Sequence, residues 1–181
     1  MALGTWTIDP SRSAIAFTVR HMVISKTRGR FTRWSGQLRF DPENPTASSV
    51  EATIEPASVD TADADRDAHL RSDFFDVERF PTASFRSTKV EDRSGNRYRV
   101  SGDLTLHGVT RPVVLEVVYG GSGKGPGGGE RAGFTASASI DRKQFGLELS
   151  KALETGGLLV GEKVDLTVEI ETIKQAQQQA A

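Results

Sequence analysis

The chain of 181 residues contains no cysteine, which excludes disulfide bonds, thiolate catalysis and cysteine-ligated metal sites. It also lacks an apolar stretch near the roughly 18 residues that a membrane-spanning helix requires. The first residues, Met1 to Trp6, have neither a basic start followed by an apolar run nor a small-residue cleavage site. We therefore expect a cytoplasmic protein without a transmembrane segment.

An excess of charge of one sign is absent from the chain as a whole. Its formal net charge is −1, which gives no global attraction to nucleic acid or to a membrane. Residues 1–40 nevertheless carry seven basic side chains against one acid, Asp9, a local net charge of +6 that the remaining residues balance with −7. These cations form either a set of solvated strand faces or a positive rim for an anionic head group.

Metal and catalytic motifs are also missing. The three histidines, His21, His69 and His107, have no metal-binding spacing on a helix, and no serine lies in a nucleophile elbow. The aromatic residues share the strand parity of the aliphatic ones, which is the core side rather than an exposed face for stacking bases. We therefore predict no metal site, no catalytic residue, no covalent cofactor and no nucleic-acid partner.

A period of two residues dominates what is present, and it predicts strands with one buried face. Val164, Leu166, Val168 and Ile170, for example, alternate with polar residues. About eight strands follow from this pattern: 15–19, 34–40, 50–54, 83–91, 100–106, 113–117, 134–140 and 164–170.

Turn and helix signals lie between these strands. The helix formers and early acids of TADADRDAHLRS predict one short helix at 64–71. We predict hairpin turns at 94–96 and 107–110, a flexible glycine-rich loop at 120–129, a short turn at 142–145 and a flexible tail at 175–181. Residues 1–174 then form a single domain.

Many strands, few helices and no internal repeat favour an all-β fold: an eight-stranded antiparallel barrel, or alternatively a sandwich, with one or two short helices near one end. A barrel of eight strands either fills with its own side chains or holds one ligand. The inward set mixes small residues such as Ala136 with large ones such as Phe134. A cavity is therefore consistent with the pattern, but periodicity alone does not show whether the interior is hollow.

Several collinear blocks together resemble the YceI-like family of lipid-binding proteins. The blocks are Trp6-x-Ile8-Asp9-Pro10-x-x-Ser13-x-Ile15-x-Phe17-x-Val19-Arg20-His21-Met22, Arg28-Gly29-Arg30-Phe31, Asp65-Arg66-Asp67-x-His69-Leu70-Arg71-Ser72, Gly102-x-Leu104-Thr105-Leu106-His107-Gly108-Val109-Thr110-Arg111-Pro112-Val113 and Asp141-Arg142-x-x-Phe145-Gly146. The resemblance covers roughly residues 5–173. A multi-block match is far more specific than any single motif.

The resemblance implies a lipocalin-like barrel with a long tunnel for polyisoprenoid chains, such as isoprenoid quinones or prenyl diphosphates. It also implies a homodimer. The function expected is that of a carrier, buffer or sensor that is not an enzyme and makes at most transient contact with membranes. Two alternatives stay open: an enzyme acting on a lipid or quinone in the same tunnel, and a stress-related structural barrel without a ligand.

The candidate binding residues fall into two groups. Those expected to contact the lipid tail, or else simply to pack the core, are Phe17, Val19, Trp34, Leu38, Phe74, Phe75, Phe85, Leu104, Leu115, Phe134 and Ile140. Those expected to contact the head group, or else to form structural ion pairs and hydrogen bonds, are Arg20, His21, Arg30, Arg66 and His69.

Overall fold

The computed structural model describes residues 3–21, 25–148 and 160–176. Its strands are β1 (Gly4–Ile8), β2 (Ala14–His21), β3 (Ser25–Phe31), β4 (Trp34–Phe40), β5 (Ser49–Ile54), β6 (Val59–Asp60), β7 (Ala83–Asp92), β8 (Arg97–Leu106), β9 (Val109–Lys124), β10 (Glu130–Asp141) and β11 (Val160–Lys174). The helical segments are α1 (Ala64–His69), the π-helical turn η4 (Leu70–Phe74) and the 3₁₀ turns η1 (Pro10–Arg12), η2 (Pro45–Ala47), η3 (Pro56–Ser58) and η5 (Arg142–Phe145). None of these helices is long and apolar enough to cross a membrane.

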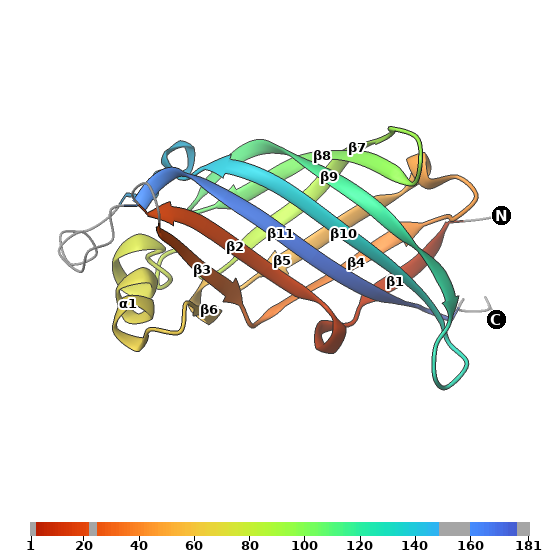
Figure 1. Ribbon diagram of the computed structural model, residues 1–181, viewed down its shortest axis with the longest axis horizontal. Coiled ribbons are helices and arrows are strands. Elements are labelled where there is room, and N and C mark those ends of the chain that lie inside the picture. Colours follow the sequence, from red (N-terminus) through yellow and green to blue (C-terminus); the bar gives the residue numbers. More distant parts are fainter. Residues whose placement is uncertain (1–2, 22–24, 149–159, 177–181) are drawn as a thin grey trace.

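The strands form one closed antiparallel barrel (Figure 1). Three long strands are each interrupted once, so that β1 continues into β2, β3 into β4, and β5 into β6. Pro10 and Pro56 lie at two of these breaks, where a residue without an N–H cannot continue a ladder. The pairing of β1 with both β4 and β11 closes the barrel. The predicted eight-stranded antiparallel barrel with short helices at one end is thereby confirmed.

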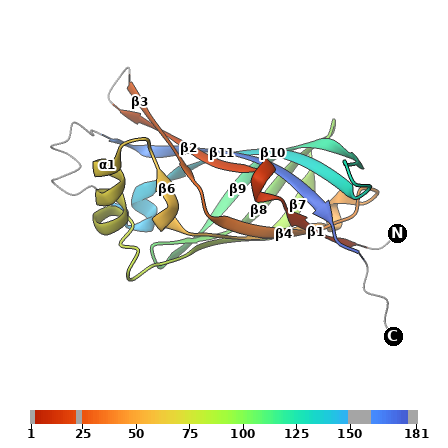
Figure 2. The same ribbon diagram turned by 90° about the horizontal axis from the view of Figure 1, so that it is seen from below.

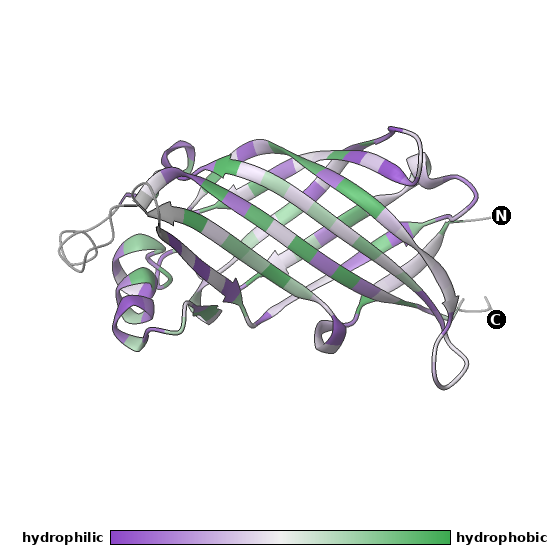
Figure 3. Ribbon diagram, viewed as in Figure 1, coloured by the Kyte–Doolittle hydropathy of each residue, from purple (hydrophilic) through white to green (hydrophobic). Residues whose placement is uncertain are grey.

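The alternation of side chains along the strands decides which residues face inward (Figure 3). Phe134, Ala136, Ala138 and Ile140 of β10 lie opposite Ile170, Val168, Leu166 and Val164 of β11. Because successive residues of a strand point to opposite faces, a shift of one residue would turn this whole apolar set toward solvent. The hydrophobic pattern therefore determines the register.

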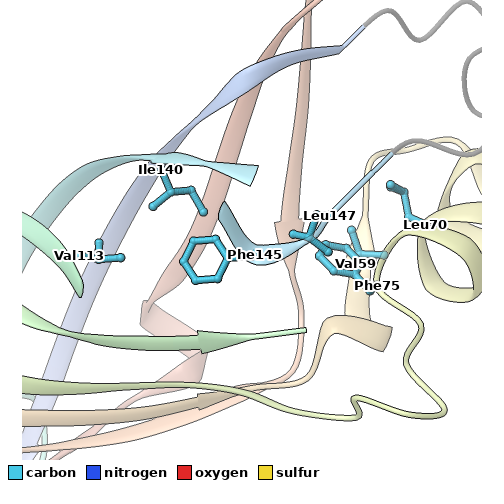
Figure 4. Packing of buried hydrophobic residues seen from close by; sticks show 7 residues of the cluster. All are labelled: Val59, Leu70, Phe75, Val113, Ile140, Phe145 and Leu147. Atoms are coloured by element: carbon cyan, nitrogen blue, oxygen red, sulfur yellow. The ribbon is translucent and has the colours of Figure 1, made fainter. Parts of the chain in front are cut away.

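The two ends of the barrel are built differently. The helical segment α1–η4 covers one end, and the chain termini lie at the other (Figures 1 and 2). At the helical end, Leu70 and Phe75 pack with Val59, Phe145 and Leu147 (Figure 4). At the opposite end, a second cluster is built around the fully buried Trp6, with Ile8, Leu38, Phe40 and Ala132. We call the first the plug end and the second the aromatic end.

The structure corrects two expected element boundaries and adds three strands that were not expected, β1, β3 and β6. Gly120–Lys124, expected to belong to a flexible loop, continue β9 and pair with β10 up to Lys124 and Glu130. Strand β3 was not predicted, because its inward residues Thr27, Gly29 and Phe31 include only one large apolar side chain. The predicted helix 64–71 is α-helical only to His69 and then widens into the π-helical turn.

The C-terminal segment shows a smaller difference. Gln175, the first residue of the expected flexible tail, donates its backbone N–H to the Thr5 carbonyl and its side-chain amide to the Thr7 hydroxyl. Residues 177–181 of that tail lie outside the described part of the chain. The expected turn at 142–145 is confirmed as the 3₁₀ turn η5.

Candidate functional site: an apolar tunnel with a basic mouth

The interior of the barrel contains two apolar hollows. The distal hollow, toward the aromatic end, has a volume of about 180 Å³ and is lined by residues that include Trp34, Val50, Leu115 and Phe134. The proximal hollow, toward the plug end, has a volume of about 150 Å³, and its lining includes Phe17, Phe31, Phe74 and Phe75.

The two hollows adjoin at a common ring of side chains. Ile15, Ile54, Leu104 and Leu166 line both of them, so the hollows adjoin at these four residues. We call the two hollows together the tunnel and these four residues its waist. Thr27 in the proximal hollow and Phe40 in the distal hollow are thirteen residues apart along β3 and β4. At about 3.3 Å per residue, this corresponds to roughly 40 Å of strand.

The burial of the inward-facing residues agrees with an unfilled interior. Leu104, Leu115 and Val168 point inward yet are only half-buried, whereas Trp6 at the aromatic end is completely buried. At about 24 cal/mol per Å³ of enclosed cavity, filling a space of this combined size with apolar atoms contributes at most several kcal/mol, on the order of 8. Because the wall also offers almost no hydrogen-bond partner for water, the tunnel suits an apolar occupant.

A polar groove lies beside the proximal hollow at the surface. Lys26, Thr27 and Arg28 of β3 line it on one side, and Thr61 and Arg66 of the plug segment line it on the other. Thr27, Thr61 and Arg66 also line the proximal hollow, so the groove forms the mouth of the tunnel on this side. Strand β6 pairs with β3 only at Arg30 and Phe31, which leaves the edge at 26–29 without a strand partner on the groove side among the described residues.

Arg66 is held at this mouth by Thr61. Its Nε donates to the Thr61 hydroxyl, and one terminal nitrogen, Nη2, donates to the Thr61 carbonyl, both at 2.9 Å. The other terminal nitrogen, Nη1, lies 4.0 Å from the carboxylate of Asp63. The Thr61 hydroxyl in turn donates to the buried carboxylate of Asp67 at 2.5 Å, and Asp67 also accepts the Thr61 backbone N–H at 3.0 Å. The guanidinium is therefore preorganised beside the groove.

Lys26 and Arg28 differ from the next two arginines along the chain. Arg30 pairs with Asp60 at 3.2 Å and Arg33 with Glu55 at 2.6 Å, whereas Lys26 and Arg28 form no ion pair with another described residue. Among the described residues, Lys26 and Arg28 therefore give the mouth a positive charge that no carboxylate pairs with, and Arg66, beside Asp63, lies across the groove from them. Such a charge attracts an anionic group, and the attraction weakens as salt increases.

The predicted tail-contacting residues come together in the tunnel. All eleven line one or both hollows: Trp34, Leu38, Phe85, Leu115 and Phe134 in the distal hollow, Phe17, Val19, Phe74, Phe75 and Ile140 in the proximal hollow, and Leu104 at the waist. Whether they touch a lipid remains a prediction.

The predicted head-group residues are not brought together in the same way. Arg66 lines the groove, but Arg30 pairs with Asp60, and the exposed His69 lies 3.3 Å from Asp73 on the plug segment. The side chains of Arg20 and His21 lie outside the described part of the chain. Sequence reasoning did not select Lys26 and Arg28, because β3 was not identified as a strand that faces the plug.

The tunnel wall offers few groups for acid–base chemistry. Within residues 3–21, 25–148 and 160–176, the ionisable side chains that line the two hollows are Arg66, Arg142, Tyr98 and Tyr119. Arg142 is buried and donates to the carbonyls of Gly161 and Leu147, while burial raises the pKa of Tyr98 and keeps its hydroxyl neutral. Among the described residues no cluster of three or more histidines and carboxylates could hold a metal ion.

Sequence comparison finds relatives of this chain among known proteins. The family described as "YceI-like domain" matches residues 6–172. A UPF0312 protein of Photorhabdus laumondii is 41% identical over 169 residues, which cover 93% of this chain and 84% of that protein.

Two solved structures are similar over nearly the whole chain. BcnA of Burkholderia cenocepacia superposes with a TM-score of 0.79 at 25% identity, covering 91% of this chain and 98% of that one. A domain of Saccharophagus degradans, described as polyisoprenoid-binding and implicated in plant cell wall breakdown, superposes with a TM-score of 0.70 at 16% identity, covering 96% of this chain and 99% of that one. The second likeness supports the fold only.

Proposed function

Since the chain belongs to the family of YceI-like domains, we propose that its tunnel binds a long-chain isoprenoid lipid. The observation that carries this proposal is the pair of apolar hollows that adjoin at a shared waist, with a basic groove beside the proximal hollow. The Saccharophagus degradans domain of the same fold is described as polyisoprenoid-binding, which agrees with an isoprenoid ligand.

The binding energy of such a ligand comes mainly from its tail. Each CH₂ group that leaves water contributes about 0.8 kcal/mol, so a tail of several isoprene units binds without many polar contacts. The same physics gives broad selectivity, because one methylene changes affinity by only about 1–3 kcal/mol. The length of the tunnel then limits the length of chain that is fully sheltered.

The mouth favours one class of head group. Lys26, Arg28 and Arg66 supply several charged N–H donors, and hydrogen bonds between such donors and phosphate oxygens are stronger than those to neutral oxygens. Of the two candidate ligands, we therefore favour the prenyl diphosphate over the isoprenoid quinone. The protein would act as a carrier, buffer or sensor of this lipid.

The test is to block the waist. Wild-type protein, purified from cells and extracted with organic solvent, should release an isoprenoid that mass spectrometry identifies, and delipidated protein should bind added geranylgeranyl diphosphate. The substitution Leu104→Trp places a large side chain where both hollows meet. It should abolish both results while the circular dichroism spectrum is retained.

The matched control adds a tryptophan outside the tunnel. Val114→Trp adds the same bulk at an exposed position on β9 and should bind lipid like the wild type. Wild-type protein that carries no lipid and also ignores added geranylgeranyl diphosphate would contradict the proposal.

The two alternatives make different predictions. A solid structural barrel would not have the 150 and 180 Å³ hollows, and it would bind neither lipid nor small apolar molecules. An enzyme acting in the tunnel would show turnover of the bound lipid. The lining carries no carboxylate or histidine among the described residues, which favours binding without catalysis.

Two further expectations stay predictions. Light scattering during size-exclusion chromatography measures whether the protein is a homodimer, and flotation with anionic vesicles measures transient membrane contact. We propose the homodimer because the resemblance to the YceI-like family implies it, and the membrane contact because an insoluble lipid has to be exchanged with a membrane or with another protein.

A further inference from the structure

Phe17 and Gly29 form a cross-strand pair on the inner face of β2 and β3. The Phe17 ring lies over Gly29 so closely that a Cβ atom on residue 29 would be 2.3 Å from Cζ and 2.8 Å from Cε1 and Cε2 of the ring. Such distances are far below van der Waals contact. The ring therefore occupies the space that a side chain at position 29 would fill, and it lies against the barrel wall.

The same arrangement recurs on the other side of the waist. Phe85 of β7 lines the distal hollow, and a Cβ atom on Gly102 of β8 would lie 2.4 Å from its Cζ. Each of these phenylalanines thus lines one hollow and lies over a glycine of the neighbouring strand. At both glycines a Cβ atom would overlap the ring as it lies in the structure, although Phe85 is a diagonal neighbour of Gly102 and pairs with Leu104.

We propose that Gly29 sets the bore of the tunnel, that is its inner width, at the entrance and thereby determines which lipid tails can pass. This inference rests on the proposed lipid binding. Along β2 the register places Val19 opposite Thr27 at the mouth, Phe17 opposite Gly29 next, and Ile15 at the waist beyond. A tail with its head group in the groove has to pass Phe17 to reach the waist.

The ring has one direction in which to move. Phe17 packs against Phe31 along the wall, with ring centroids 5.4 Å apart, and the proximal hollow lies on its free side. The three atoms nearest to a Cβ on residue 29 all belong to the Phe17 ring, so a methyl group there displaces the ring into the hollow. At Gly102, in contrast, the Arg86 carbonyl oxygen would lie 2.6 Å away, and a side chain would also strain the backbone. Gly29 is therefore the better position to test than Gly102, because a substitution there acts on the ring and not on the backbone.

The experiment compares Gly29→Ala with the double variant Gly29→Ala/Phe17→Leu. We expect Gly29→Ala to weaken the binding of geranylgeranyl diphosphate, measured by titration calorimetry, roughly tenfold or more, the range in which overpacking of a core falls. The smaller leucine side chain of the double variant should restore binding to at least threefold tighter than in Gly29→Ala, a difference of about 0.7 kcal/mol or more. The control Gly123→Ala, where a Cβ meets no atom within 4 Å, should bind like the wild type.

A second measurement separates this inference from the proposed function. Xenon taken up by crystals under pressure should occupy the proximal hollow of the wild type, lose occupancy in Gly29→Ala and regain it in the double variant. If the wild type binds xenon but no isoprenoid, the proposed function fails. The xenon occupancies of the three proteins still decide whether Gly29 controls the width of the proximal hollow.

The outcomes that overturn the inference are specific. Equal lipid affinity and equal xenon occupancy in Gly29→Ala and the wild type would show that the ring does not control the bore. If Gly29→Ala fails to fold, recovery of folding and binding on adding Phe17→Leu supports the inference, and failure of Phe17→Leu to restore either one overturns it.

Discussion

Trp6 and Phe40 are joined by two interactions at the seam where the barrel closes. The indole Nε1 of Trp6 donates a 3.2 Å hydrogen bond to the Phe40 carbonyl, and the two rings meet edge to face with their centroids 5.7 Å apart. Trp6 lies on β1, which pairs with both β4 and β11, and its side chain is completely buried. The pair therefore ties β1 to β4 at the aromatic end, next to the distal hollow that Phe40 also lines.

The first prediction follows from that contact. Trp6→Phe removes the hydrogen bond and part of a buried ring, and it should lower the free energy of unfolding by about 2 kcal/mol. Urea denaturation measures this as a lower midpoint with an unchanged m value. Trp34→Phe, at a half-buried position in the distal hollow, should cost less than about 1 kcal/mol. Equal losses in the two variants would contradict the distinction between a packed end and a hollow middle.

The second prediction concerns the plug. Thr61→Val removes the buried hydroxyl that joins Asp67 to Arg66, and hydrogen bonds to charged groups contribute about 1.5–3 kcal/mol each. We expect a stability loss in that range and faster amide hydrogen exchange in residues 61–75. Ser72→Ala, which removes an exposed hydroxyl from the same segment, serves as the control. Unchanged exchange in Thr61→Val would show that this network does not hold the plug.

The third prediction concerns acid stability. The Ser11 hydroxyl, followed by the Arg131 guanidinium, holds the pKa of Asp9 below its ordinary value. Because the folded state binds this proton more weakly than the unfolded chain does, the stabilisation is present above the unfolded pKa of about 4. It is lost as the pH falls through the lower folded pKa.

Urea unfolding between pH 2 and pH 7 measures this effect. Asp9→Asn should be less stable than the wild type at neutral pH, and the difference should shrink as the pH drops below about 4. Glu116→Gln removes an exposed ion pair with Arg99 on the outer wall. It should leave the free energy of unfolding between pH 2 and pH 4 almost unchanged. A difference between Asp9→Asn and the wild type that stays constant over the whole range would refute the assignment.

The fourth prediction concerns the mouth. Replacing Lys26 and Arg28 together by glutamine should weaken geranylgeranyl diphosphate binding roughly tenfold at low salt, since exposed charge pairs contribute about 0.2–1 kcal/mol each. Binding of the uncharged alcohol geranylgeraniol should not change. The control Arg99→Gln removes a cation that is paired with Glu116 away from the groove. An equal loss for diphosphate and alcohol would show that the variant damages the tunnel rather than a head-group contact.

The strand pattern was sufficient for the fold class and for the wall of the candidate site. Because residues two apart in a strand share a face, Phe134, Leu104 and Ile140 were assigned to the inner face without coordinates, and the structure places them there. The pattern was insufficient for β3, whose inward residues carry too little apolar surface to stand out. The pattern also predicted too short a strand for β9, because its glycines continue the ladder through backbone pairing and add nothing to the apolar pattern.

The amino-acid sequence by itself determined an all-β chain, the face of each strong strand and the composition of the wall, because these depend on local periodicity. Only the tertiary structure decided that the wall surrounds a tunnel, since the same inward residues could have filled it. That outcome depends on where each ring lies, and Phe17 lies against the wall because Gly29 of the neighbouring strand leaves room for it. The basic mouth is equally a product of folding, because chain closure brings Lys26 and Arg28 to the same groove as Arg66.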